Sequence, residues 1–312
     1  MRLVFLGTSE FACPALRELV RAGHDIAAVV TAPSRRGGRG KKPLRSPVEQ
    51  AAGEIGLPLL RPEDPNSEDF VRELSGLGPE LGILVSYGHI LHEKLMSVPP
   101  RGFLNLHPSL LPAYRGAAPI QRALMDGVGT TGVCVIQMAR KVDAGDILAR
   151  RAASVGPDDT AGELSDRLAE LGAGLLVDTI GKIGRDEVSG EQQDTAAVTR
   201  APKLTEKDRI LDWTLPADAL HNRIRALSPS PGAWTLFRGE RLLVYRSRPA
   251  AGPTPAPPGT ILSDRTGLWV ATGSGILELL QVKPQGSKVQ DGRSFVNGRR
   301  PESNEKLETG GT

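Results

Sequence analysis

The sequence contains few cysteines and no long apolar run. Its two cysteines, Cys13 and Cys134, lack the spacing of metal ligands and are too few for a disulfide framework. No apolar stretch approaches the roughly 20 residues of a membrane-spanning helix. The opening residues, MRLVFLGTSEF, lack the basic and apolar regions of an export signal. We therefore expect a cytoplasmic protein with reduced thiols, no metal and no membrane contact.

Two catalytic signatures are also absent. Gly7-Thr8-Ser9 follows an apolar run but lacks the second and third glycines of the dinucleotide-binding fingerprint, which excludes a nicotinamide enzyme. No serine or cysteine lies in a G-x-S-x-G or comparable context, so the sequence offers no activated nucleophile. Any acyl transfer is therefore expected to be direct, without a covalent intermediate on the enzyme.

Short apolar runs alternate with helical stretches over the first two thirds of the chain. They predict buried strands at 3–6, 26–30, 82–85, 103–105, 133–138 and 147–153. Thr8 and Ser9 are expected to cap the first helix, and Thr160 with Glu163 forms a capping box for a later one. Strands that alternate with helices are typical of a parallel α/β sheet. We expect a Rossmann-like domain over residues 1–202.

The remaining sequence has a different pattern. A helix is predicted at 217–227, and short strand-like runs follow at 234–237, 242–248, 259–262, 268–271 and 276–282. Five short strands separated by turn residues suggest a small barrel of the OB type. We expect this second domain to span residues 203–301, followed by a disordered tail at 302–312.

Positive charge is concentrated in two places. Residues 205–301 contain 14 lysines and arginines against 8 acidic residues, whereas residues 1–204 have a net charge of −1. Between Pro33 and Val48 lie six cations and no acid, interleaved with three glycines: Arg35, Arg36, Arg39, Lys41, Lys42 and Arg45. This loop is either a plain solvated loop or a segment that folds on a polyanion, and the basic second domain favours the polyanion.

Asn105-Leu106-His107-Pro108 follows the apolar approach 102–104. Along a strand, Asn105 and His107 share one face, and Pro108 ends the strand. The two side chains are thus presented at the carboxyl edge of a sheet, where open α/β folds bind ligands. Both can donate hydrogen bonds to an oxygen that acquires negative charge, as acyl transfer requires.

Asp143 lies in a turn, residues 142–146, between two predicted strands. A carboxylate beside an imidazole can hold it protonated and relay a proton. Asn105, His107 and Asp143 together suit attack by an amine on an activated acyl group. Asp146 is the competing carboxylate in the same turn.

The motifs at 105–112, 114–121 and Asp143-x-Gly145 resemble the folate-dependent formyltransferases, over nearly the whole chain. The forms Arg-Gly-Ala-Ala-Pro-Ile-Gln and, at 38–42, Gly-Arg-Gly-Lys-Lys are similar to the members that act on methionyl-tRNA. The family pattern favours Asp143 over Asp146 as the catalytic acid. Where the family usually has an acid and a glycine before this turn, the chain has Ala139-Arg140-Lys141, and the two cations would lower the pKa of Asp143 if they pointed inward.

The resemblance implies roles for further residues. Folate contacts are expected at Ser109, Leu110, Leu111, Pro112, Ser86, Tyr87 and Gly88. The six cations of the glycine-containing loop are expected to bind tRNA.

The implied activity is transfer of a formyl group from 10-formyltetrahydrofolate to the α-amino group of methionyl initiator tRNA, by direct amine attack, in a monomer without metal. Two alternatives stay open. One is a related formyltransferase acting on a sugar nucleotide or ribonucleotide amine, and the other is a non-catalytic RNA-binding module.

Overall fold

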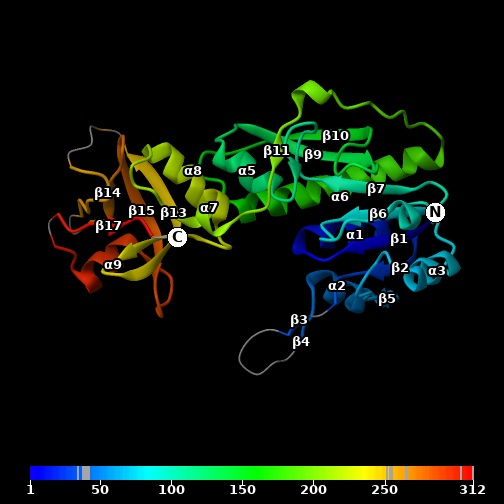
Figure 1. Cartoon of the computed structure of the whole chain (residues 1–312), viewed down its shortest axis with the longest axis horizontal. Helices are drawn as coiled ribbons and strands as arrows, with labels where there is room; N and C mark the ends of the chain where they lie inside the picture. The colour runs from blue at the N-terminus through cyan, green and yellow to red at the C-terminus, as the bar shows by residue number, and fades with distance from the viewer. Residues whose placement is uncertain are drawn as a thin grey trace. The chain divides into compact units, whose positions relative to one another are not determined.

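The computed structural model describes residues 1–33, 35–36, 43–250, 252, 256–263, 266–302 and 304–310. The chain divides into two compact units (Figure 1). The first comprises residues 1–116, 130–154 and 165–200, and the second comprises 117–129, 155–164 and 201–312. The second unit thus includes residues 117–129, 155–164 and 201–202, which the expected boundary at residue 202 assigns to the first domain.

The first unit is built on a sheet in the order β10-β9-β7-β6-β1-β2-β5. The strands are β1 (Arg2–Gly7), β2 (Asp25–Val30), β5 (Leu59–Leu60), β6 (Leu81–Val85), β7 (Phe103–His107), β9 (Thr130–Gln137) and β10 (Ile147–Ser154). Strands β7, β6, β1, β2 and β5 pair in parallel, whereas β9 is antiparallel to both of its neighbours. The short turn between β9 and β10 allows only antiparallel pairing of these two strands. The predicted Rossmann-like α/β class is confirmed, with one reversed strand.

Helices accompany this sheet: α1 (Cys13–Arg21), α2 (Pro47–Ile55), α3 (Glu68–Gly76), α4 (Glu93–Met96) and α6 (Ala161–Gly184). Residues 3–6 of β1 are fully buried, as expected for a strand covered on both faces. The capping box before α6 is present, since Thr160 Oγ1 accepts from Glu163 N at 3.3 Å and Glu163 Oε2 accepts from Thr160 N at 3.0 Å. No helix among the described residues is long and apolar enough to cross a membrane.

Thr8 and Ser9 do not cap a helix with their side chains. A 3-10 turn, η1 (Glu10–Ala12), precedes α1, and neither helix receives a side-chain cap at its start. Thr8 Oγ1 instead donates to Tyr87 O at 3.0 Å, and Ser9 Oγ donates to Ser86 Oγ at 2.7 Å. The capping prediction was wrong because these hydroxyls join the ends of the neighbouring strands β1 and β6.

The second unit contains an antiparallel sheet in the order β14-β15-β13-β12-β17, with β16 beside β15. Its strands are β12 (Ala233–Phe237), β13 (Glu240–Ala250), β14 (Trp269–Ala271), β15 (Ile276–Pro284), β16 (Gln290–Asp291) and β17 (Leu307–Glu308). Its helices are α5 (Pro119–Met125), α7 (Glu206–Arg209), α8 (Ala217–Leu227) and α9 (Gly292–Arg299). A small antiparallel β domain is therefore confirmed, and α8 has the predicted bounds. The strand predicted at 259–262 contributes only isolated bridges at Thr260 and Ile261.

The C-terminal segment is ordered over the residues described there. Strand β17 pairs with β12, and Leu307 is 2% exposed within the core of the second unit. Leu307 N also donates to Gly259 O at 2.9 Å. Within the segment expected to be a disordered tail, the structure thus places a short strand, and the one large apolar residue of this polar segment is buried in the core.

Candidate active site

Strand β7 carries two polar side chains on one face. Asn105 lies opposite Leu84 of β6 and Ile136 of β9, and both Asn105 and His107 are buried. Leu106 points to the other face, where a Cβ added to Gly172 of α6 would lie 2.8 Å from it. The missing side chain at Gly172 lets α6 approach β7 closely, which fixes the strand from behind.

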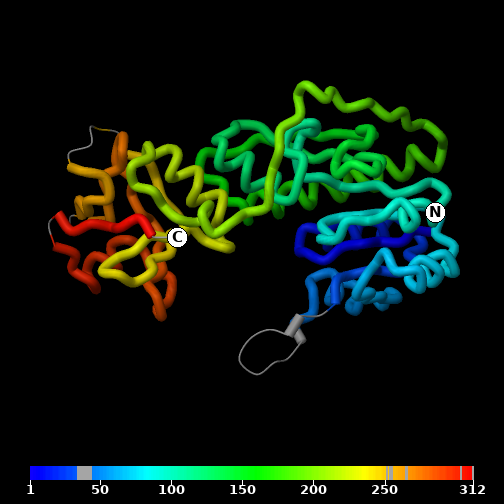
Figure 2. The backbone as a smooth tube through the Cα atoms, in the orientation of Figure 1, coloured from blue at the N-terminus to red at the C-terminus, as the bar shows by residue number. Residues whose placement is uncertain are grey.

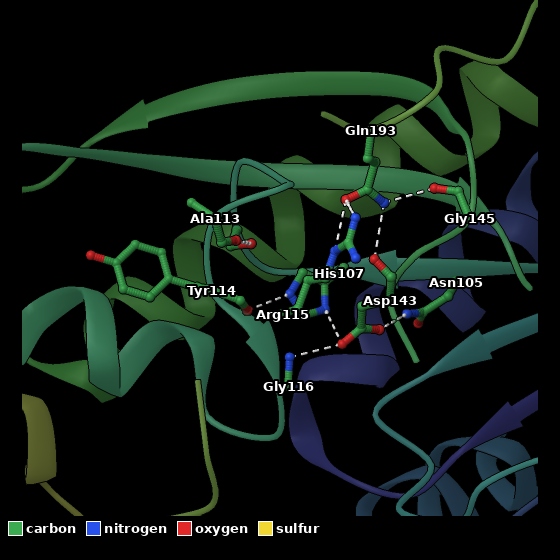
Figure 3. Close-up of polar contacts among 10 residues, drawn as sticks. Asn105, His107, Ala113, Tyr114, Arg115, Gly116, Asp143, Gly145 and Gln193 are labelled. Atoms are coloured by element: carbon green, nitrogen blue, oxygen red, sulfur yellow. Dashed lines mark hydrogen bonds and ion pairs between the residues drawn. The ribbon is translucent and has the colours of Figure 1, made fainter. Parts of the chain in front are cut away.

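Asp143 reaches this face from the turn between β9 and β10 (Figure 3). Its Oδ1 accepts from Asn105 Nδ2 at 3.1 Å, its Oδ2 accepts from Gly116 N at 2.9 Å, and Oδ2 lies 3.6 Å from His107 Nδ1. The turn is tight: Asp143 has a φ of +54°, and a Cβ at Gly145 would lie 1.7 Å from the Gln137 carbonyl oxygen. The structure thus brings together the three residues for which the sequence predicts catalytic roles.

His107 uses both ring nitrogens inside the protein. Its Nε2 lies 3.0 Å from Tyr114 O, and a carbonyl oxygen can only accept, so Nε2 carries a hydrogen. Nδ1 attracts the Asp143 carboxylate only when Nδ1 also carries a hydrogen. The ring is then doubly protonated and positively charged.

Asp146 is placed differently. It is exposed, and its backbone oxygen accepts from Gln137 N at 3.0 Å. Among the described residues, its carboxylate makes no hydrogen bond and no ion pair, whereas that of Asp143 contacts Asn105 and His107. The geometry therefore supports Asp143 as the acid of the site.

Gln193 was not expected at the site. It follows α6 in the segment that runs back along the first unit to β11 (Arg200–Ala201), which pairs with β8 (Arg115–Gly116) (Figure 2). Its Nε2 donates to Asp143 O at 2.9 Å and to Gly145 O at 2.7 Å, and its Oε1 accepts from Arg115. The surrounding sequence is polar and aperiodic, so no pattern singles this glutamine out.

A pocket opens beside Asn105 and Asp143. It encloses about 520 Å³ of empty space when the open solvent at its mouth is counted. Apolar side chains dominate its lining, and two of them, Ile90 and Val142, are 69% and 55% exposed. The full lining is Leu84, His89, Ile90, Leu91, Asn105, Ile136, Met138, Ala139, Arg140, Val142 and Asp143.

The residues with predicted folate contacts do not line this pocket. Ser109 is fully buried and donates its hydroxyl hydrogen to Ala113 O at 2.6 Å. Leu111 is buried in a cluster with Cys134, Ile136 and Ile147. Leu110 approaches Gly132, and Pro112 continues the same turn. This segment supports the end of β7 from within the unit.

Ser86, Tyr87 and Gly88 lie next to the pocket without lining it. Tyr87 is buried in the core, and burial, reinforced by the Asp64 charge, raises its pKa to about 12. Its ring lies 5.2 Å from that of His89, which does line the pocket. Gly88 adopts a φ of +90°, which glycine tolerates, and this turns the chain toward the lining residues His89, Ile90 and Leu91.

The basic loop is only partly described. Arg39, Lys41 and Lys42 lie outside the described residues, and the backbones of Arg35 and Arg36 form β3 (Arg35–Arg36), paired with β4 (Pro43–Leu44). The side chain of Arg45 is 73% exposed, and its Nε lies 3.7 Å from Glu49 Oε1.

Two further observations concern charge at the site. Arg140 and Lys141, which stand where the family usually has an acid and a glycine, are exposed. Across the part of the chain that the structure describes, no cluster of three or more histidine, cysteine or acidic side chains is arranged to hold a metal ion.

Comparison with known proteins gives concordant results for both units. Residues 1–180 match the family model described as formyl transferase, and residues 203–300 match its C-terminal domain. Methionyl-tRNA formyltransferase from Solibacter usitatus is 45% identical over 310 residues, covering 99% of each chain. The enzyme of the same name from Heliobacterium modesticaldum is 44% identical, over 96% of this chain and 98% of the relative.

Solved structures share the fold at lower identity. HypX from Aquifex aeolicus in complex with tetrahydrofolic acid has a TM-score of 0.66 at 17% identity, over 100% of this chain and 51% of that one. An N-formyltransferase from Helicobacter canadensis, in complex with folinic acid and dTDP-3-aminofucose, has a TM-score of 0.67 at 14% identity, over 89% and 98% of the two chains. The chain belongs to the formyl transferase family and, within it, to the methionyl-tRNA formyltransferases.

Proposed function

We propose that the protein transfers the formyl group of 10-formyltetrahydrofolate to the α-amino group of methionyl initiator tRNA. The observation that carries this proposal is the convergence of Asn105, His107 and Asp143 beside a pocket with an apolar rim. The full-length relatives named methionyl-tRNA formyltransferase support the choice of acceptor. We further propose that the protein acts as a monomer in the cytoplasm, where charged initiator tRNA is used.

In this reaction the amine nitrogen attacks the formyl carbon, and the bond from that carbon to N10 of the folate breaks. The tetrahedral intermediate carries an oxyanion, the amine loses a proton, and N10 gains one. Asn105 Nδ2 gives one hydrogen to Asp143 and has a second that meets no acceptor among the described residues. Because Asn105 lines the pocket, this second N–H is available to stabilise the oxyanion.

Asp143 and His107 have the two remaining roles, which are removal of the amine proton and stabilisation of the oxyanion by charge. Asp143 lines the pocket and is a carboxylate held by two N–H donors, so it can take the surplus proton of the amine directly or through one water. His107 lies behind it, with Nδ1 3.6 Å from Asp143 Oδ2, and its ring adds positive charge near the developing oxyanion when both nitrogens carry a hydrogen. Contact between His107 Nε2 and the oxyanion requires release of the Tyr114 carbonyl.

We assign the folate ring to the pocket beside Asn105. A mostly apolar lining suits the faces of a planar heterocycle, and Ile90 and Val142 offer it exposed apolar surface. This assignment moves the folate contacts from Ser109–Pro112 to the residues that line the pocket. Ser86, Tyr87 and Gly88 keep an indirect role, because they position His89.

The basic loop and the second domain are proposed to bind tRNA. We place the boundary between the catalytic domain and this second domain at residues 202 and 203. Some cations of the second unit are already paired: Arg238 with Glu305, Arg241 with Glu206, and Arg246 with Glu163. The loop cations Arg35, Arg36, Arg39, Lys41, Lys42 and Arg45 are therefore proposed to supply the contacts nearest the acceptor end. Arg39→Ala should weaken tRNA binding and reduce its salt dependence, with folate binding unchanged as the control.

One assay separates the candidate functions. Release of tetrahydrofolate is measured with three acceptors: charged initiator tRNA, free methionine and a nucleotide sugar amine. The proposal requires efficient release only with charged tRNA. Efficient release with the nucleotide sugar would establish the related formyltransferase instead. Tight tRNA binding with no release on any acceptor would indicate a non-catalytic RNA-binding module.

A further inference from the structure

Gln193 uses both ends of its side-chain amide in hydrogen bonds. Nε2 donates to the backbone oxygens of Asp143, at 2.9 Å, and Gly145, at 2.7 Å. Oε1 accepts from two nitrogens of Arg115, Nε at 3.0 Å and Nη2 at 2.7 Å. Figure 3 draws these bonds as dashed lines. The residue is 6% exposed, so little water competes for them.

These four hydrogen bonds join two segments that position the side chains of Asp143 and His107. One segment is the tight turn that presents Asp143 at a φ of +54°, a conformation that needs support from its surroundings. The other is the stretch around Arg115, whose neighbour Tyr114 accepts from His107 and whose neighbour Gly116 donates to Asp143. Gln193 thus connects the backbone under the carboxylate with the chain that orients both the carboxylate and the imidazole.

Only an uncharged amide satisfies both sides at once. A carboxylate at position 193 would accept from Arg115 but could not donate to the two carbonyl oxygens, and it would face them as an acceptor. An apolar side chain would leave the carbonyls and the guanidinium without these partners. We infer that Gln193 is a positioning residue that holds Asp143 between Asn105 and His107 for formyl transfer. The inference rests on the proposed function.

The test is Gln193→Glu, which keeps the size of the side chain and the acceptor for Arg115 and removes the donor. The matched control is Gln192→Glu, the same change at the exposed neighbouring position. Because a displacement of about 1 Å in a catalytic group costs up to ~10²-fold in rate, Gln193→Glu should lower kcat by ~10–100-fold. The KM values for folate and tRNA should stay near those of the wild type, and Gln192→Glu should behave like the wild type.

A double-mutant cycle with Asp143→Asn distinguishes positioning from general damage. If Gln193 acts through Asp143, Gln193→Glu should cost little more once Asp143→Asn is present. An equal loss in both backgrounds would overturn the inference, as would wild-type kcat in Gln193→Glu. Thermal unfolding checks that the variant is folded. If it is not, Arg115→Lys perturbs the same contacts more gently and should lower kcat in the same direction, and an unchanged kcat there would also overturn the inference. An inactive wild type would instead refute the proposed function.

Discussion

Exchanging one carboxylate for an amide separates the two acids of the turn. In Asp143→Asn the side chain keeps its shape but has only one acceptor oxygen. The native carboxylate accepts from Asn105 Nδ2 on one oxygen and from Gly116 N on the other. In either orientation of the new amide, one of these N–H donors faces an NH₂ group and loses its partner, at a cost of about 1–3 kcal/mol.

The loss in rate should exceed this structural effect. Removal of a general base typically costs ~10²–10⁴ in turnover, so Asp143→Asn should lower kcat by at least ~10². Asp146→Asn is the matched control in the same turn. Asp146 is exposed, and its backbone bond to Gln137 survives the exchange, so the change in stability should be within about 0.5 kcal/mol and kcat should fall by less than ~3-fold.

Both variants are compared by tetrahydrofolate release on charged initiator tRNA in single-turnover experiments, with folate binding measured separately. Equal losses in the two variants would mean that the turn as a whole matters and not the Asp143 carboxylate. A larger loss in Asp146→Asn would transfer the catalytic role to Asp146 and refute the assignment.

Three further changes test other parts of the structure. His107→Ala should lower kcat by ~10²–10³ with tRNA affinity retained, and wild-type turnover in this variant would remove His107 from the mechanism. Arg122, chiefly through its side-chain hydrogen bonds, lowers the pKa of Asp208 from 3.8 to about 2. The ionised Asp208 therefore stabilises the folded protein above pH ~4, and this stabilisation is lost as the pH falls toward 2. Asp208→Asn should therefore cost about 2 kcal/mol at pH 7 and progressively less below pH ~4 in unfolding experiments, and a difference independent of pH would contradict this. Leu307→Ala should destabilise the second unit by about 2–5 kcal/mol, whereas an unchanged melting temperature would show that the C-terminal strand adds nothing.

The sequence predicts the fold class well where periodicity and capping agree. The apolar runs at 26–30 and 82–85 are strands of the sheet, and α8 has the predicted bounds because a polar, proline-rich stretch ends its pattern. The sequence does not predict β5 or β17, each only two residues long, because so short a strand carries no period. These strands form because the neighbouring strand offers unpaired backbone groups, a property of the tertiary structure.

In the site, too, the sequence predicts residues that follow a local pattern and does not predict residues that act through contacts distant in the sequence. Asn105 and His107 are predictable together because a strand places alternate residues on one face. Asp143 is 36 residues beyond His107, so no local pattern links the two, and only the resemblance to a family favours Asp143 over Asp146. Gln193 lies a further 50 residues along, in a segment without periodicity, and its role follows from bonds to backbone oxygens of residues 143 and 145 that no sequence pattern records.

The folate contacts expected at Ser109–Pro112 stay a prediction, and burial separates Ser109 and Leu111 from the residues that line the pocket. A sequence motif contains both residues that contact a ligand and residues that support them. The amino-acid sequence of the motif alone does not distinguish these two kinds of residue. Asn105 lines the pocket, whereas Ser109 and Leu111 of the same motif are buried in the scaffold behind it. A ligand can contact only a surface that it can reach, so burial decides between the two roles. Ile90 and Val142 are large apolar side chains that are left exposed beside the Asp143 carboxylate. A ligand that covers them would remove more apolar surface from water than one that covers any residue of Ser109–Pro112.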